Sequence, residues 1–125
     1  MVDVEECRKW SATQFQDSLM RFIQLGKSHY GEAPMIYSVN AFDNRCCAPR
    51  FNNFHLMICR YGINEPVIKG RGTYTIWQKF QAGKLPGIPE EIDIDFFRKE
   101  VQIDDILLAK YPKLLVTLPA GSFHV

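Results

Sequence analysis

The feature that most constrains the fold of this chain is a proline-punctuated stretch, Leu85 to Pro119, with the sequence LPGIPEEIDIDFFRKEVQIDDILLAKYPKLLVTLP. Pro86 and Pro89 fix the backbone φ angle and bias the residues before them toward extended backbone. Asp93 follows where it can cap a helix, and Asp95 stands where the helix dipole favours a negative charge. The stretch therefore predicts an extended entry followed by a short helix.

The predicted helix would separate apolar from charged side chains. Phe96, Phe97 and Val101 are expected on one side, whereas Arg98 and Lys99 are expected on the side that faces water. No residue of the stretch is a natural catalyst, because its acids serve as helix caps, and we therefore predict a docking surface for another protein. The expected docking residues are Ile92, Phe96, Phe97, Arg98, Lys99 and Val101.

Other short helices are predicted along the chain. Ser11 and Gln14 form a capping box in front of an apolar stripe, so a helix is expected from Ser11 to Leu25, with Gly26 as its stop. Further helices are expected from Asn52 or Asn53 to Gly62, from Thr73 to Gln81, and from Asp104 or Asp105 to Tyr111-Pro112.

The segment from Lys27 to Arg50 is expected to be a long irregular connection, because glycine, proline and asparagine interrupt it repeatedly. A short extended piece is expected inside it, from Met35 to Val39. The basic run Lys69 to Gly72 is interpreted as a solvated turn, and a phosphate held by its backbone N–H groups is the alternative. It is not a P-loop, because the G-x-x-x-x-G-K-[ST] order is absent. The predicted fold is mostly α-helical: one domain over residues 1–125, with four or five short helices and long connections, supported by partners.

Composition limits the classes of function. The chain is 46% hydrophobic and 23% charged, which is typical of a globular protein, and its net charge of +1 gives no reason to expect nucleic acid or an anionic membrane as a partner. No apolar run reaches the roughly 18–20 residues that a membrane span requires. The acidic start, MVDVEECRKW, has neither the apolar region of a secretory signal nor the acid-poor character of a transit peptide.

The four cysteines, Cys7, Cys46, Cys47 and Cys59, include no C-x-x-C pair, so neither a zinc site nor a thioredoxin-like site is indicated. Reduced thiols are one interpretation, and a bridge from Cys7 to the Cys46-Cys47 pair is the other. A pairing of Cys46 or Cys47 with His55 for catalysis has no support in the local sequence, and no G-x-S-x-G motif occurs. We therefore predict no catalytic residue, no metal site, no cofactor and no small-molecule substrate.

The stretch described first resembles subunit d of the mitochondrial F-type ATP synthase, a protein of the peripheral stalk. The matching positions are Leu85, Pro86, Pro89, Ile92, Asp93, Phe96, Phe97, Arg98 and Val101, and the likeness continues through Asp104-Asp105, Tyr111, Val116 and Pro119. Ile94 departs from the family, which usually has a tryptophan there.

The resemblance covers about 35 of the 125 residues. It implies a non-catalytic structural subunit of a mitochondrial membrane complex, peripheral to the inner membrane on the matrix side. Such a subunit would hold the catalytic head against rotor torque during proton-driven ATP synthesis, and its partners would be other subunits of the complex.

A second resemblance is to the AT-rich interaction domain, a helical DNA-binding fold. It rests on the spacing of Phe15, Leu19, Phe22, Pro34, Phe51, Phe54, Ile58, Gly62 and Val67. It implies that Lys69, Arg71 and Lys79 face DNA phosphates. The near-zero net charge argues against this alternative.

Overall fold

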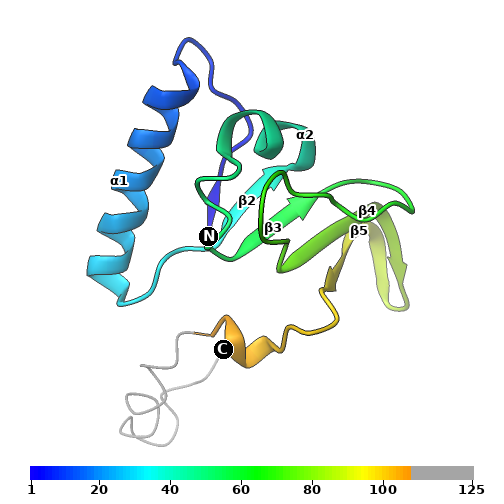
Figure 1. Ribbon diagram of the computed structural model, residues 1–125. Coiled ribbons are helices and arrows are strands. Elements are labelled where there is room, and N and C mark those ends of the chain that lie inside the picture. Colours follow the sequence, from blue (N-terminus) through cyan, green and yellow to red (C-terminus); the bar gives the residue numbers. More distant parts are fainter. Residues whose placement is uncertain (108–125) are drawn as a thin grey trace, which may run out of the picture.

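The computed structural model describes residues 1–107, which form a five-stranded sheet with one long helix packed on a face of it (Figure 1). The strands are β1 (Val2–Asp3), β2 (Ile36–Val39), β3 (Leu56–Cys59), β4 (Ile76–Leu85) and β5 (Ile88–Phe97). The helical elements are α1 (Ala12–Tyr30), the short α2 (Asn40–Phe42), the π-helical turn η1 (Asp43–Cys47) and the 3-10 turn η2 (Ile103–Asp105).

The strand order in the sheet, β1-β2-β3-β4-β5, is the order of the sequence. Strands β1 to β4 are parallel neighbours, and β5 returns antiparallel to β4 as the second arm of a hairpin. Parallel pairing brings the carboxyl ends of β1, β2 and β3 to the same edge of the sheet. The segments that leave these strands therefore lie together.

Helix α1 confirms the predicted capping box and extends beyond the predicted end. The Ser11 side chain accepts a hydrogen bond from the Gln14 backbone, and the Gln14 side chain accepts one from the Ser11 backbone. The helix passes Gly26 and ends at Tyr30, because Gly31 takes the left-handed conformation (φ 82°) that caps it. Gly26 instead lies 3.3 Å from the Pro34 ring, measured from the position that a Cβ would occupy, so it serves close packing.

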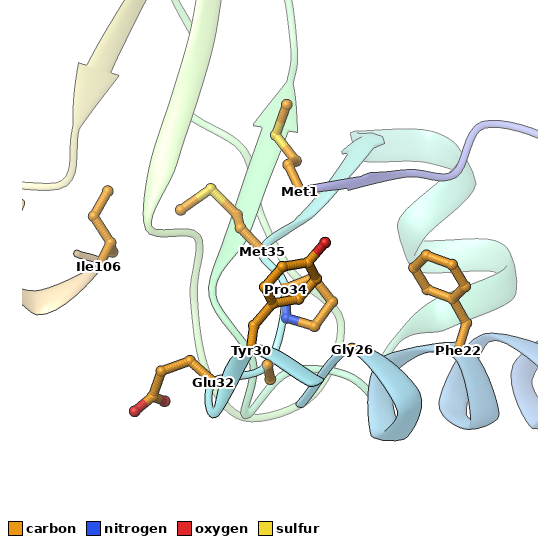
Figure 2. A pocket seen from close by; sticks show the side chains of 9 residues that line it. Met1, Phe22, Gly26, Tyr30, Glu32, Pro34, Met35 and Ile106 are labelled. Carbon is orange, nitrogen blue, oxygen red and sulfur yellow. The ribbon is translucent and has the colours of Figure 1, made fainter. Parts of the chain in front are cut away.

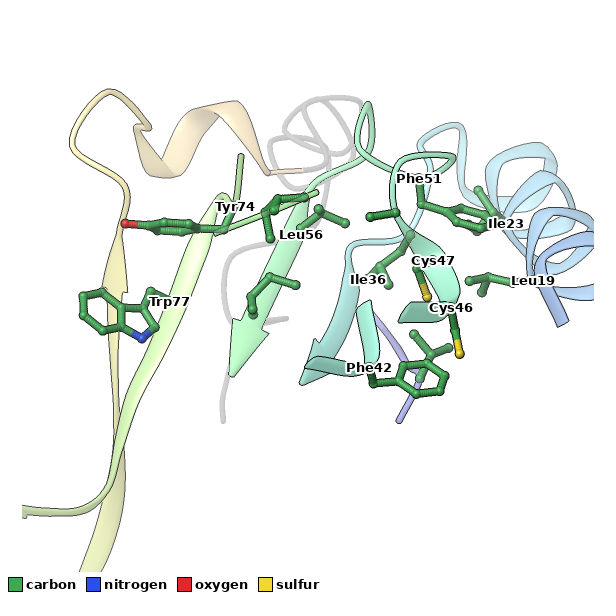
Figure 3. Packing of buried hydrophobic residues seen from close by; sticks show 14 residues of the cluster. Leu19, Ile23, Ile36, Phe42, Cys46, Cys47, Phe51, Leu56, Tyr74 and Trp77 are labelled. Atoms are coloured by element: carbon green, nitrogen blue, oxygen red, sulfur yellow. The ribbon is translucent and has the colours of Figure 1, made fainter. Parts of the chain in front are cut away.

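Side chains alternate between the two faces of the sheet. One face and α1 enclose the core, in which Leu19 and Ile23 of the helix face Cys47 and Phe51 (Figure 3). The strands contribute to this core Ile36, Leu56, Ile58 and Trp77. The alternate residues of the same strands lie on the opposite face of the sheet, where they are paired across neighbouring strands. These residues are Tyr37, Val39, Met57, Cys59, Ile76 and Gln78.

The predicted mostly α-helical fold is wrong. The segment expected as a helix from Asn52 or Asn53 to Gly62 contains turns followed by β3, and Thr73 to Gln81 leads into β4. The reason is that strands buried in a parallel sheet are short and apolar, so their sequence does not differ from that of a short buried helix. The extended piece expected at Met35 to Val39 is confirmed as β2.

The helix that was expected to begin at Asp93 is not formed. Asp93 lies within strand β5, and Asp95 is paired with Gln78 of β4. Ile92, Ile94 and Phe96 alternate with Asp93, Asp95 and Phe97, which is the period of a strand. The helix expected after Asp104 or Asp105 is a 3-10 turn as far as the described residues go. The positions predicted from Leu108 onward, including Tyr111, Pro112, Val116 and Pro119, lie outside the described residues.

Within residues 1–107, no helix combines the length and the apolar character needed to cross a membrane.

Candidate active site

Four carboxylates share the face of the sheet that points away from α1. Asp3 of β1 is aligned with Tyr37 of β2, and Glu5 follows it at strand spacing. On β5, Asp95 is aligned with Gln78, and Asp93 lies on the same face because strand side chains alternate. The two pairs of acids, which are separated by most of the described chain, therefore share one face of the sheet and stand on its first and last strands.

A hollow of about 630 Å³ opens at the carboxyl ends of β1, β2 and β3. It is lined by Glu5, Tyr37, Val39, Asn40, Ala41, Cys59, Arg60 and Tyr61. In open parallel sheets, ligands bind outside the carboxyl ends of the strands. The hollow therefore stands where such a fold places its chemistry.

The charges in this region perturb one another. The charge of Asp3 is the largest cause that raises the pKa of Glu5 above its ordinary value. Burial, and then the charge of Asp93, raise the pKa of Asp95. The close approach of like charges favours the protonated form of Glu5, which is the form that donates a proton.

Tyr61 lines the hollow together with Glu5. Its pKa is raised first by a hydrogen bond with Cys59, and the charges of Asp93 and Glu5 both add to the effect. Tyr61 also lines a second, smaller hollow with Phe80, Gln81, Ala82 and Gly83. The exposed rings of Tyr61 and Phe80, at 50% and 42% exposure, thus continue the hollow along the β4–β5 hairpin.

Hydrogen bonds hold the walls of the hollow in place. The Tyr37 hydroxyl donates to Oε1 of Gln78 over 2.6 Å, and Nε1 of Trp77 donates to the Arg60 carbonyl over 2.7 Å. Nη1 of Arg60 donates to the Glu65 carbonyl over 3.1 Å. These bonds tie β2 and the segment that follows β3 to β4.

Another hollow, of about 500 Å³, lies at the amino ends of β1 and β2, beside Met1 and Met35 (Figure 2). Phe22, Gly26 and Tyr30 of α1 form its far wall. Glu32 is the one charged residue in its described lining. Its described lining holds one carboxylate and none of the four acids described above.

The six predicted docking residues do not form one surface of a helix. Ile92, Phe96 and Phe97 belong to β5, where Phe96 packs near Trp77 on one face and Phe97 points to the other. Arg98, Lys99 and Val101 follow the strand, and the Arg98 backbone N–H donates to the Thr75 carbonyl. A docking role for these residues stays a prediction.

The acids at the start of the chain were not predicted as functional. In the run Val2-Asp3-Val4-Glu5, apolar and acidic residues alternate, and this period of two is the signal of a strand with acids on one face. Asp93 was interpreted only as a helix cap. A pairing of cysteine with His55, which the sequence does not support, is not seen in the structure either: Nδ1 of His55 lies 3.2 Å from Oγ1 of Thr75. Among residues 1–107, no three acids, histidines or cysteines are grouped as a metal site would require.

Comparison with known proteins identifies related sequences. Residues 1–88 match the family described as glycosyl hydrolases family 25. The uncharacterized protein YegX of Escherichia coli strain K12 is 26% identical over 102 residues, which are 82% of this chain and 37% of that protein. YegX of strain O157:H7 is 27% identical over 97 residues, 78% of this chain and 35% of the relative. The chain thus spans little more than a third of the length of these relatives.

Solved structures share the fold. The bacterial lysozyme from Streptomyces coelicolor superposes with a TM-score of 0.71 and 22% identity, over 86% of this chain and 52% of the lysozyme. The Clostridium perfringens spore cortex lytic enzyme SleM gives a TM-score of 0.70 and 20% identity, over 82% of this chain and 37% of the enzyme. A family GH25 lysozyme from Aspergillus fumigatus gives a TM-score of 0.65 and 22% identity, over 82% of this chain and 51% of the lysozyme.

These matches correct the predicted function. A match to a glycosyl hydrolase family over residues 1–88 contradicts the resemblance to ATP synthase subunit d, and with it the stalk role, the mitochondrial inner-membrane location and the non-enzymatic character. The alternative of a DNA-binding domain is wrong as well, because its predicted helices after Asn52 and Thr73 are strands.

Proposed function

The chain belongs to glycosyl hydrolases family 25, and from this premise we propose that it acts on glycosidic bonds in the glycan of bacterial cell walls. The observation that carries the proposal is that Asp3, Glu5, Asp93 and Asp95 share one face of the sheet, and that Glu5 lines a hollow at the strand ends. Paired carboxylates are the chemical requirement for cleaving a bond between sugars. The names of the structural neighbours, which are lysozymes and a spore cortex lytic enzyme, support the choice of glycan.

Glu5 is assigned as the general acid. It lines the hollow, and the charge of Asp3 raises its pKa, so Glu5 keeps its proton to a higher pH than an isolated glutamate does. In this role it protonates the oxygen that leaves as the glycosidic bond breaks. Asp3 is assigned as a positioning residue, because its negative charge and its hydrogen bond with Glu5 both raise the pKa of Glu5.

Asp93 is assigned as the second carboxylate. The charge of Asp93 on β5 and the charge of Glu5, which follows β1, both raise the pKa of Tyr61. Cleavage develops positive charge on the sugar carbon, and a fixed negative group close to this carbon lowers the energy of the transition state. The two acids then divide the work: Glu5 supplies the proton and Asp93 stabilises the charge.

The exposed aromatic rings of Tyr61 and Phe80 give the sugar chain a surface to lie on. Both rings line the hollow that continues from the acids. Flat aromatic groups bury a large area and still leave polar edges accessible to water. A sugar ring has an apolar face bounded by hydroxyls, and it fits such a surface.

The test measures reducing ends released from purified peptidoglycan by the full chain and by two single-site variants. Glu5→Gln removes the proton donor and is expected to lower the rate by at least about 100-fold. Glu6→Gln is the matched control, because Glu6 is exposed and pairs with Arg8 at 2.8 Å rather than lining the hollow. Equal rates in the wild type and the Glu5→Gln variant would refute the assignment.

A second readout separates binding from catalysis. The Tyr61→Ala variant is expected to bind soluble cell-wall glycan fragments more weakly by titration calorimetry. The Glu5→Gln variant is expected to bind them as the wild type does, since the amide keeps the size of the acid. If neither variant changes binding or rate, the sugar does not occupy this hollow.

A further inference from the structure

The sulfur atoms of Cys7 and Cys46 lie 2.9 Å apart, although the residues are separated by 39 positions in the sequence. The sulfurs of a disulfide are about 2.05 Å apart, so a movement of about 0.9 Å closes the bond. Both cysteines are free thiols in this structure. The geometry therefore selects one partner from the adjacent pair Cys46-Cys47.

Both backbones are fixed near the two sulfurs. The Cys46 carbonyl accepts a hydrogen bond from Nε2 of Gln16 over 2.7 Å, which ties η1 to α1. The Cys7 carbonyl accepts one from the Trp10 backbone N–H over 3.0 Å. The two sulfurs consequently face each other from anchored segments.

The other two cysteines are placed differently. Cys47 is fully buried at 0% exposure, and burial raises the pKa of its thiol to about 12. Cys59 lies on the sheet face that carries Tyr37 and Gln78, whereas Cys46 and Cys47 belong to the core on the opposite face. Cys7 is half-buried and is the most accessible of the four.

We propose that Cys7 and Cys46 are a modification site, at which a disulfide links the segment after β1 to the turn η1. The proposal does not depend on the glycosidase assignment, although the segment that it fixes carries Glu5. A bond of this kind closes a long loop, and such bonds stabilise a fold by restricting the unfolded chain.

The oxidant is a small-molecule disulfide such as oxidised glutathione. The Cys7 thiol loses its proton, and the thiolate attacks one glutathione sulfur, which forms a mixed disulfide and releases one glutathione thiolate. The Cys46 thiolate then attacks the Cys7 sulfur and releases the second glutathione. The two protein thiols lose two protons and two electrons in total, and the glutathione disulfide is reduced to two thiols.

The exchange is expected to accelerate as the pH rises. Burial is the largest cause that raises the pKa of Cys7, to about 11, so little thiolate is present at neutral pH. The reaction is therefore run at pH 8 and pH 9 with excess oxidised glutathione on the full chain. The product expected after trypsin digestion without reductant is the peptide of residues 1–8 joined to the peptide of residues 46–50.

Variants assign the partner, because Cys46 and Cys47 fall in the same tryptic peptide. Cys47→Ala should keep the cross-link, whereas Cys46→Ala should lose it and stop at the mixed disulfide with glutathione. Oxidation should raise the Tm of the wild type and of Cys47→Ala by roughly 10 °C, and should leave Cys46→Ala unchanged. The Cys7→Ser variant, at a half-buried position on the edge of the core, should also lose the cross-link.

The outcomes that overturn the proposal are specific. A cross-link that persists in Cys46→Ala, or that disappears in Cys47→Ala, assigns the bridge to Cys47. A wild-type chain that accumulates only glutathione adducts, with no joined peptides and no rise in Tm, shows that the sulfurs do not bond. None of these readouts measures glycan cleavage, so they are independent of the failure or success of that assignment.

Discussion

The hydroxyl of Tyr37 in β2 donates a 2.6 Å hydrogen bond to the side chain of Gln78 in β4, across the intervening strand β3. Gln78 is only 6% exposed, so its amide oxygen depends on this partner. Tyr37→Phe should lower the free energy of unfolding by about 1–2 kcal/mol, because a buried acceptor loses its donor. Urea unfolding measures the change. Tyr30→Phe, at a residue 54% exposed, is the control and should have little effect.

Replacing Asp3 should change the pH dependence of activity. Its charge is the largest cause that raises the pKa of Glu5, so Asp3→Asn lowers that pKa. A general acid works only while it is protonated, and the loss of activity on the alkaline side should therefore move to lower pH. The measurement is kcat/KM against pH. The control is Asp17→Asn, which removes a carboxylate of α1 that pairs with Arg50. This variant should leave the pH profile of kcat/KM unchanged.

Asp43 should make the fold less stable as the pH rises. The residue is 1% exposed, both of its carboxylate oxygens lack a hydrogen-bond partner in the described structure, and burial raises its pKa to about 6. Between its ordinary value of 3.8 and about 6, the folded state holds a proton that the unfolded state releases, so stability falls as pH rises through this window.

The Asp43→Asn variant tests this effect because the amide does not ionise. Relative to the wild type, it should gain about 2–3 kcal/mol between pH 4 and pH 7 in urea unfolding, since one pKa unit is worth about 1.4 kcal/mol. If the stabilities of the two proteins run parallel over that range, Asp43 does not titrate with a raised pKa in the folded state.

A comparison of Gly70 and Gly87 distinguishes the cost of backbone strain from the cost of steric crowding. Gly70 and Gly87 have nearly equal φ angles, +88° and +89°, but a Cβ on Gly70 would lie 2.7 Å from Cβ of Pro49, whereas one on Gly87 meets nothing within 4 Å. Gly87→Ala should cost about 1 kcal/mol from its left-handed conformation alone. Gly70→Ala should cost about 2–4 kcal/mol, because crowding adds to the strain. Equal losses on urea unfolding would contradict this difference.

The parts of the fold that local chemistry determines could be predicted from the sequence. The Ser11–Gln14 capping box begins α1 where expected, because its hydrogen bonds involve neighbouring residues alone. The end of α1 was placed too early, since Gly26 was interpreted as a stop although its role is close packing against Pro34. That role depends on the tertiary structure and leaves no local signal.

Strands β3 and β5 differ from the predicted helices for two different reasons. Leu56–Cys59 is a run of four apolar residues, which a buried strand and a buried helix share, so its sequence alone does not decide between them. In β5, by contrast, the alternation of Ile92, Asp93, Ile94 and Asp95 was present, and the capping interpretation of Asp93 displaced it. That Glu5 and Asp93 share one face of the sheet could not be predicted, because it depends on the order in which the strands pair.

The order of strands in the sheet has a consequence for how the protein is made. Because sheet order and sequence order coincide, each strand emerging from the ribosome meets the free edge of the strand synthesised just before it. The sheet can then grow in one direction, by addition at a single edge, with no need to open an earlier pairing. Asp93 and Asp95 are carried by β5, the last strand of the described residues, so these two carboxylates arrive after Asp3 and Glu5, and the nascent chain carries an incomplete set of acids until β5 has paired.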